Sequence, residues 1–220
     1  MVEAAENGTK TSPRERYRAR VRSEIKECAW RQMAEAGTSA LSFNAVAKQM
    51  GMTGPALYRY FASRDDLITE LIRDAYRSLA DTVQAAVEAG PDPVALAHAM
   101  RAWALADPQR YFLVFGTPVP GYHAPGEITQ IADEVMTCML AAFAALPESG
   151  PATPFETHLE SHREWAEGHA SPAALRRVLA FWTRLHGAVS LELAGHFTGM
   201  GFDPALLFAA ELDDLLGGEG

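Results

Sequence analysis

The chain has 220 residues, of which 48% are hydrophobic and 21% are charged, a composition typical of soluble globular proteins. Its apolar runs fall short of the roughly 20 residues that span a bilayer, and no apolar run follows basic residues near the N-terminus. These features argue against a membrane protein and against a visible signal peptide, so we expect a cytoplasmic protein. The two cysteines, Cys28 and Cys138, lie in apolar helical patterns and are expected to be buried, reduced thiols.

The formal net charge of −9 is divided unevenly along the chain. Residues 1–64 contain 11 Lys and Arg against 6 Asp and Glu, a net of +5, whereas the remaining residues carry a net of −14. No lysine follows Lys48. Because basic residues near phosphates supply most of the sequence-independent affinity for DNA, this asymmetry favours a nucleic-acid-binding N-terminal part and a solvated acidic remainder.

The first predicted helix follows a polar segment, residues 1–13, which lacks periodicity and is expected to be a mobile arm. Apolar residues at four-residue spacing predict a helix over Arg14–Ala36. Its other face carries Arg14, Arg18 and Arg22, which suits either phosphate contact or an ordinary solvated surface.

Two short helices separated by a glycine are predicted over Ser42–Leu67. Ser42 can cap the first helix, and Gly51 can stop it because glycine readily adopts the left-handed conformation. Thr53 can cap the second, with Pro55 in its first turn, where the missing N–H costs nothing. Two such helices form a helix-turn-helix, whose second helix can enter a major groove.

The order of residues in this stretch is distinctive, because Val-Ala, Met-Gly-Met-Thr and Leu-Tyr-Arg-Tyr-Phe follow one another at Val46, Met50 and Leu57. This pattern resembles the DNA-binding domain of TetR-family transcriptional repressors, in register from about residue 16 to residue 71. The resemblance assigns phosphate contacts to Tyr58 and Arg64. It implies that double-stranded DNA is contacted by Ser42, Asn44, Thr53, Gly54, Ala56, Tyr58, Arg59 and Arg64.

A long helix is predicted over Arg64–Glu88, and the segment Gly90-Pro91-Asp92-Pro93 ends it. At about 25 residues it would span roughly 37 Å, long enough to link a DNA-binding end to a second compartment. We place the domain boundary near Tyr76, inside this helix. The predicted domains are therefore residues 14–75, which contain the helix-turn-helix, and residues 76–220, which would bind a ligand and dimerise.

Six further helices are predicted in the second domain, which makes the expected fold all-α. Their ranges are Pro93–Ala106, Pro108–Phe115, Glu127–Leu146, Phe155–Gly168, Pro172–Phe197 and Asp203–Leu216. The segment Gly116–Gly126 contains three prolines and three glycines in eleven residues and predicts an ordered turn or lid.

The last two predicted helices are apolar around most of their circumference, so both of their faces should be buried. A subunit interface would bury both faces, because one face would pack on the core and the other on the second subunit. In TetR-like proteins such a pair forms a four-helix bundle across a two-fold axis. The resemblance therefore implies a homodimer and a palindromic operator.

A second resemblance lies in the C-terminal part. The sequence Phe-Trp-Thr-Arg-Leu-His-Gly at Phe181–Gly187 is similar to the Trp-His-Gly (WHG) type of TetR C-terminal domain, and Phe115–Gly121 fits that type as well. Trp182 and His186 share one helical face. The motif is compatible with a ligand-binding role and equally with a packing role alone.

The middle of the chain is rich in aromatic residues and methionine. Helical bundles bind small molecules in apolar pockets between helices, and the resemblance implies such a pocket here. We expect an apolar or aromatic effector with few charges to be held among Trp103, Phe112, Phe115, Tyr122, Met139, Trp182 and His186.

Three histidines on one helical face, His158, His162 and His169, invite a metal-site hypothesis. His169 would lie roughly 10 Å from His162 along a helix, too far to share one ion, so a polar helix face is favoured. The sequence has no phosphate-binding loop, no Gly-x-Ser-x-Gly elbow and no Cys-x-x-Cys pair. We therefore expect no cofactor, no metal and no enzymatic activity.

Together these patterns predict a ligand-responsive, homodimeric transcriptional regulator, most simply a repressor that a small molecule releases from DNA. One alternative is a constitutive dimeric DNA-binding regulator, an activator or a nucleoid-associated protein, without an effector. Another is a helical small-molecule-binding protein or enzyme with a vestigial N-terminal domain, which the charge asymmetry disfavours.

Overall fold

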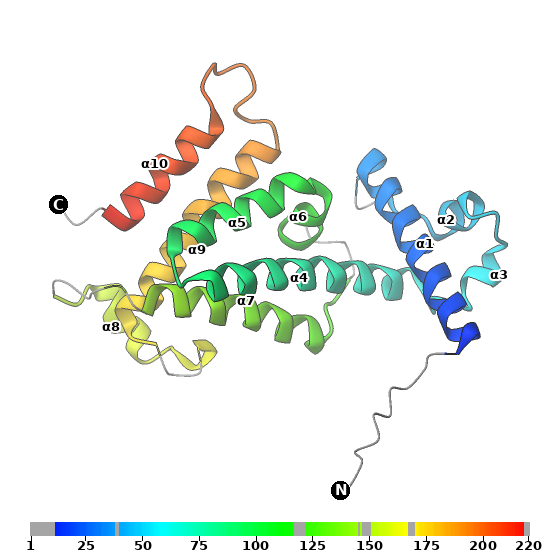
Figure 1. The fold of residues 1–220 in the computed structure, drawn as a ribbon, viewed down its shortest axis with the longest axis horizontal. Coiled ribbons are helices and arrows are strands. Elements are labelled where there is room, and N and C mark those ends of the chain that lie inside the picture. The colour runs from blue at the N-terminus through cyan, green and yellow to red at the C-terminus, as the bar shows by residue number, and fades with distance from the viewer. Residues whose placement is uncertain are drawn as a thin grey trace, which may run out of the picture. The chain divides into compact units, whose positions relative to one another are not determined.

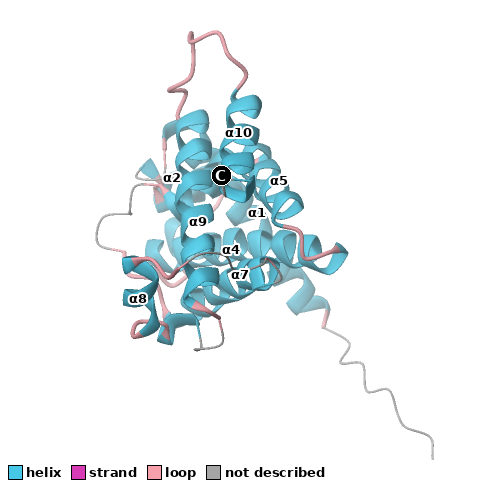
Figure 2. Cartoon of the chain, turned by 90° about the vertical axis from the view of Figure 1, so that its left-hand side faces the viewer, coloured by secondary structure: helices cyan, strands magenta, loops and turns pink. Residues whose placement is uncertain are grey.

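The computed structural model describes residues 12–37, 40–116, 122–144, 146, 151–166 and 170–217. Within these ranges the chain forms helices and connecting loops and contains no strand (Figure 2). The all-α expectation is confirmed. The predicted arm lies almost wholly outside the described residues, as do His169 and residues 117–121 of the predicted lid. None of the described helices combines the length and apolar character that crossing a membrane requires.

Ten α-helices are found in the described ranges (Figure 1). They are α1 (Pro13–Ala36), α2 (Phe43–Gln49), α3 (Gly54–Leu57), α4 (Arg64–Ala89), α5 (Pro93–Ala106), α6 (Pro108–Phe115), α7 (Gly126–Ala144), α8 (Pro154–Glu160), α9 (Pro172–Leu193) and α10 (Pro204–Gly217). A short 3-10 helix, η2, covers Glu164–Ala166.

The chain divides into two compact units, and α4 is continuous through the division. Of the described residues, the N-terminal unit contains those up to Leu71 together with Tyr122, and the C-terminal unit contains the rest. The predicted boundary lies four residues further along α4. Tyr122 is tied to the N-terminal unit by its hydroxyl, which lies 3.1 Å from the Thr69 hydroxyl on α4.

The core of the N-terminal unit follows the apolar spacing of α1. Its buried residues include Ile25, Ala29 and Met33 at four-residue intervals, which pack in the same unit as Leu57 and Phe61. Gly51 ends α2 with φ +65°, and the two backbone bonds from Gly51 to Lys48 and from Met52 to Ala47 form a Schellman motif. The predicted glycine stop is confirmed.

The core of the C-terminal unit is built around α9, which contacts α5, α7, α8 and α10 (Figure 1). Fully buried side chains of this core come from α4, α5, α7 and α9, and they include Val83, Leu96, Met139, Val178 and Phe181. These residues form one continuous apolar cluster, which holds the helices of this unit around a common interior.

Two ion pairs join α4 to α7, and in both the arginine lies on α4 and the glutamate on α7. Arg73 pairs with Glu127, and Arg77 makes a forked pair with Glu134 at 2.6 and 3.1 Å. Because these side chains are largely exposed, the pairs set the alignment of the two helices more than their stability.

The predicted helix Phe155–Gly168 is wrong in its length, because α8 ends at Glu160. The His158 carbonyl accepts hydrogen bonds from the Ser161 hydroxyl at 3.3 Å and from Nδ1 of His162 at 2.8 Å. These side chains occupy an acceptor that a continuing helix would use, and the chain turns before η2.

The predicted helix Pro172–Phe197 is also too long, because α9 ends at Leu193. Gly195 has φ +77°, and bonds from Gly195 to Glu192 and from His196 to Leu191 complete a second Schellman motif. A residue with a side chain is strained in this conformation, so the glycine fixes the end of α9.

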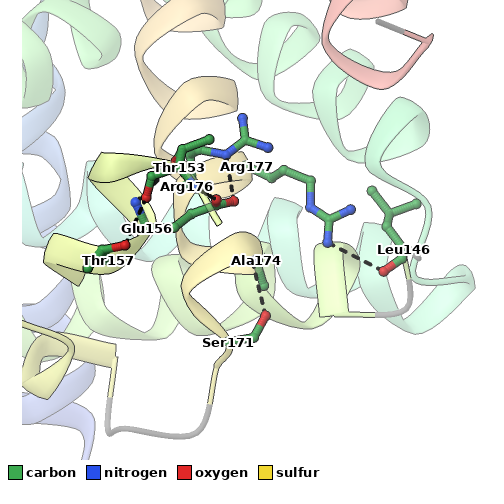
Figure 3. A network of polar contacts seen from close by, with 8 residues as sticks. All are labelled: Leu146, Thr153, Glu156, Thr157, Ser171, Ala174, Arg176 and Arg177. Carbon is green, nitrogen blue, oxygen red and sulfur yellow. Dashed lines mark hydrogen bonds and ion pairs between the residues drawn. The ribbon is translucent and has the colours of Figure 1, made fainter. Parts of the chain in front are cut away.

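A buried carboxylate joins α8 to α9 (Figure 3). Glu156 accepts from the backbone N–H of Thr153 at 2.6 Å and from Nε of Arg176 at 2.9 Å, while its own N–H donates to the Thr153 hydroxyl. The Thr153 backbone bond, with Arg176 second, lowers the pKa of Glu156 below its usual value. The capping box of α8 thus also anchors that helix to α9.

Candidate functional site

The helix-turn-helix leaves polar groups uncommitted at the start of its second helix. Ser42 caps α2 by accepting from the Ala45 N–H at 3.3 Å. Thr53 is the N-cap residue of α3 but makes no side-chain cap bond, and its side chain is exposed. The Thr53 hydroxyl is therefore available to a partner outside the chain.

The exposed face of α3 continues through Tyr58 and Arg59. The Tyr58 side chain is 56% exposed although its ring packs 4.8 Å from that of Phe43. The Arg59 side chain is also exposed, and its guanidinium has no partner among the described residues. An exposed cation and an exposed phenol suit contact with a polyanion.

Two arginines of α1 secure the end of α3. Arg18 donates to the Arg59 carbonyl at 2.9 Å, and Arg22 donates to the Tyr60 carbonyl. Arg22 also pairs with Glu70 of α4 at 3.2 Å and lies over the Phe61 ring at 4.2 Å. Because these bonds satisfy carbonyls of the turn that follows α3, the two arginines hold that turn, and with it the end of α3, against α1.

The remaining predicted DNA contacts are Asn44, Gly54, Ala56 and Arg64. The amide oxygen of Asn44 lies 3.7 Å from the position that a Cβ on Gly54 would take, and Ala56 is half-buried. Arg64 is half-buried and donates from Nε to the Leu41 carbonyl at 2.9 Å. Its guanidinium is thus partly engaged in holding α4 to the segment before α2.

A cavity of about 20 Å³ lies in the C-terminal unit, roughly the space that one water needs. Its lining comes from α4, α5, α6, α9 and α10. Four of the seven predicted ligand-binding residues line it, namely Trp103, Phe115, Trp182 and His186. The other three do not, since Met139 is buried in the core, Phe112 packs against the core and Tyr122 bonds to Thr69.

The cavity wall is an aromatic cluster. The His186 ring lies 4.0 Å from that of Trp182 and 4.3 Å from that of Phe115, and Phe115 and Trp182 are 5.4 Å apart. Trp103 completes the wall and donates from Nε1 to the Ser78 hydroxyl of α4 at 3.2 Å. The accessible surface of the cavity is almost entirely apolar.

A hydrogen-bonded group that sequence reasoning missed stands behind His186. The Tyr111 hydroxyl lies 2.9 Å from Nδ1 of His186 and 2.6 Å from the Ser190 hydroxyl. Burial lowers the pKa of His186 to about 4 and raises that of Tyr111. The i, i+4 spacing of His186 and Ser190 on α9 was visible in the sequence, but their partner on α6 was not.

A second missed polar feature is an ion pair at the cavity wall. Arg101 lines the cavity and makes a forked bond to Glu192 at 2.5 and 3.0 Å. Both side chains are largely buried, 16% and 15% exposed, and the Arg101 guanidinium lies over the Phe208 ring. The charges of the two groups offset each other inside the unit.

The histidines considered for metal binding do not gather a ligand set. His158 and His162 stack at 4.1 Å, and His169 lies outside the described residues. No cluster of three potential metal ligands is present in the part of the chain that the structure describes.

Comparisons with known proteins match both units. The family described as bacterial regulatory proteins, tetR family, matches residues 25–71, and the Tetracyclin repressor-like C-terminal domain matches residues 93–215. The second match is consistent with the WHG-type resemblance.

The HTH-type transcriptional regulator Rv1816 of Mycobacterium tuberculosis is 34% identical over 210 residues, covering 88% of this chain and 90% of that protein. The regulator Mb1846 of Mycobacterium bovis matches to the same extent. The crystal structure of SCO4313, described as a regulatory protein, shares 65% identity with a TM-score of 0.87, covering 94% of this chain and 100% of that one. These relatives indicate a DNA-binding transcriptional regulator and not an enzyme. The chain belongs to the TetR family of transcriptional regulators.

Proposed function

We propose that the chain is a ligand-responsive repressor that acts in the cytoplasm as a homodimer and leaves a palindromic operator when a small molecule binds. The observation that carries this proposal is the aromatic cavity of the C-terminal unit. Its wall residue Trp103 is hydrogen-bonded to Ser78 on α4, the helix that begins in the N-terminal unit.

An effector can shift the DNA-binding equilibrium only if it binds one conformation better than the other, and such coupling is typically about 1–3 kcal/mol. A molecule entering the cavity would press on Trp103 and so on Ser78. The resulting displacement of α4 would alter the spacing of the two recognition helices in a dimer.

The dimer interface is proposed to be formed by α9 and α10. Exposed apolar side chains follow one another at the end of α9 and the start of α10: Leu191, Met200, Phe202 and Leu206. Leu206 is 70% exposed, which an α-helix of a free monomer would not favour. A two-fold axis here would set two recognition helices roughly 34–36 Å apart, for successive major grooves.

The test is binding of the purified protein to its own upstream intergenic DNA, with and without extracted metabolites. In a gel-shift assay, the protein should retard the DNA band, and addition of the metabolite extract should abolish this retardation. Trp103→Ala should remove the response to the extract while DNA affinity is retained. Trp165→Ala is the matched control, because Trp165 is exposed and does not line the cavity.

The competing function is a constitutive DNA-binding regulator without an effector, and the small size of the cavity favours it. A DNA complex that no metabolite fraction dissociates would support this alternative. Loss of both DNA binding and response in Trp103→Ala would mean that Trp103 is core and that any pocket lies elsewhere. A monomer at micromolar concentration in sedimentation, with DNA binding intact, would contradict the dimer.

A further inference from the structure

One buried polar atom of His186, a residue that lines the cavity, has no partner in the described part of the chain. Nε2 of His186 has almost no solvent exposure and makes no hydrogen bond among the described residues. The other ring nitrogen, Nδ1, is occupied by the Tyr111 hydroxyl. A buried polar atom without a hydrogen bond is destabilising, so a partner for this atom would be favourable.

The hydrogen bonds behind His186 decide what kind of partner Nε2 needs. The Ser190 hydroxyl has one partner in the described structure, the Tyr111 oxygen at 2.6 Å, and either hydroxyl can donate in this contact. Donation by Ser190 leaves the proton of Tyr111 for a second acceptor, which is the arrangement that the proposal below requires. Tyr111 then donates its own proton to the closer of its two remaining acceptors, Nδ1 of His186 at 2.9 Å, in preference to the His186 carbonyl at 3.3 Å. A neutral imidazole with Nδ1 as acceptor carries its hydrogen on Nε2.

The charges around the cavity exclude a charged partner. Burial keeps the pKa of His186 well below neutrality, so the ring is uncharged. Arg101, the cation at the wall, is already paired with Glu192 through two bonds. An anion would have to break that pair, and a cation would meet a donor and apolar rings; either would be buried without compensation.

We propose that the effector of this cavity is an uncharged, largely aromatic or apolar molecule with one hydrogen-bond acceptor, a carbonyl or ether oxygen, which accepts from Nε2–H of His186. The proposal rests on the proposed ligand-responsive function and specifies its ligand class. Tyr111 and Ser190 serve as positioning residues, because they hold the imidazole in the donor tautomer.

The first test needs no ligand. Nitrogen NMR of the imidazoles in the full-length protein distinguishes a protonated Nε2 from a protonated Nδ1. The signal of His186, assigned by its loss in His186→Phe, should show hydrogen on Nε2. In Tyr111→Phe, which keeps the ring but removes the donor, this tautomer preference should weaken. A free protein with hydrogen on Nδ1 of His186 would overturn the proposal.

The second test compares three probes of similar size: acetophenone, ethylbenzene and benzoate. Binding is followed by the fluorescence of the protein, since Trp103 and Trp182 line the cavity. Acetophenone should bind about five-fold more tightly than ethylbenzene, the worth of one hydrogen bond, and benzoate should bind least. Equal binding of the ketone and the hydrocarbon, preference for benzoate, or binding of none of the three would each overturn the proposal.

Variants then locate the preference. His186→Phe should remove the advantage of acetophenone and leave ethylbenzene binding nearly unchanged. His158→Phe is the matched control, because His158 is exposed on α8 and should keep the advantage. If His186→Phe retains the five-fold preference, another donor binds the ketone and the proposal fails.

The two proposals fail in different ways. If DNA is released by a metabolite but the ketone has no advantage, the chain is ligand-responsive and its ligand class is other than proposed here. If the ketone binds through His186 but neither probe nor metabolite alters DNA binding, the cavity binds ligands without regulating DNA.

Discussion

The α3 region and the cavity differ in the exposure of their polar groups. At the two ends of α3, Thr53, Tyr58 and Arg59 are exposed, and the turn after the helix is secured by Arg18 and Arg22. At the cavity, charges are paired inside the unit, and one nitrogen of His186 is buried without a partner.

This difference fits the two kinds of partner that we propose for the two regions. DNA brings many charges and is bound in water, so a surface of exposed donors on a firm backbone suits it. A small apolar molecule has few polar atoms. A site for it is suited by charges that are already paired within the protein and by one polar atom that still lacks a hydrogen-bond partner. The predictions below test whether each region depends on the groups that this comparison assigns to it.

The largest effect is expected at the buried ion pair. Glu192→Ala should lower the free energy of unfolding by about 3 kcal/mol, because it leaves the Arg101 guanidinium unpaired in an apolar unit. Urea denaturation measures this. Glu134→Ala, which removes the exposed partner of Arg77, is the control and should cost less than about 1 kcal/mol. Equal losses in the two variants would show that the cavity pair behaves as a surface pair.

A smaller loss of stability is expected when Arg22, which bonds the turn after α3, is removed. Arg22→Ala removes the bond to the Tyr60 carbonyl and the pair with Glu70, so stability should fall by about 2 kcal/mol and operator affinity should fall with it. Arg20→Ala, which breaks an exposed pair with Glu24 on the same helix, should change neither. Arg22→Ala with reduced DNA affinity and unchanged stability would instead indicate that Arg22 contacts phosphate.

Acid should weaken the C-terminal unit through protonation of His186. The folded-state pKa of His186 is about 4, below its ordinary value of 6.5, so the unfolded chain binds the extra proton and stability falls as pH drops through this window. Between pH 7 and pH 5 the loss should be about 1–2 kcal/mol. The lowered pKa values of Glu15, Glu134 and Glu156 act only below about 4.5, where these acids lose their stabilising charge.

Urea denaturation at several pH values measures this loss, and His186→Phe should flatten the dependence. The same slope in His186→Phe as in the unaltered chain would place the responsible group elsewhere.

The smallest effect is expected for a single phosphate contact. Arg64→Ala should weaken binding to all DNA sequences alike. The slope of log affinity against log salt concentration should fall by about one, as it does when one phosphate contact is lost. Arg64 also donates to the Leu41 carbonyl, so its removal can lower stability as well. The free energy of unfolding of the Arg64→Ala variant must therefore be measured in parallel. A change in the preferred base would contradict the assigned role.

The sequence predicted what depends on local pattern. As expected, α2 begins after Ser42 and ends before Gly51. The apolar spacing of α1 correctly predicted its buried face. Both signals are local, because caps and helical periodicity act over a few residues. Gly195 carried the same kind of signal as Gly51, but the apolar run around it favoured a longer helix. The end of α8 depends on side chains that compete for one carbonyl, which periodicity does not reveal.

What the sequence did not predict are contacts between residues far apart in the chain. Arg18 and Arg22 were placed on one face of α1, but their partners, the Arg59 and Tyr60 carbonyls, depend on how α3 packs. Tyr111 meets His186 across 75 positions, and Arg101 meets Glu192 across 91. Such pairs are fixed by tertiary packing, so only the structure can bring them together.

The narrowness of the cavity has a kinetic consequence. A space of about 20 Å³ cannot admit an aromatic molecule unless the rings of Phe115, Trp182 and His186 first move apart. Uptake would then be limited by how often this cluster opens. The observed rate of effector binding would level off with rising concentration, and the apparent affinity would be reduced by the fraction of time that the cluster is open.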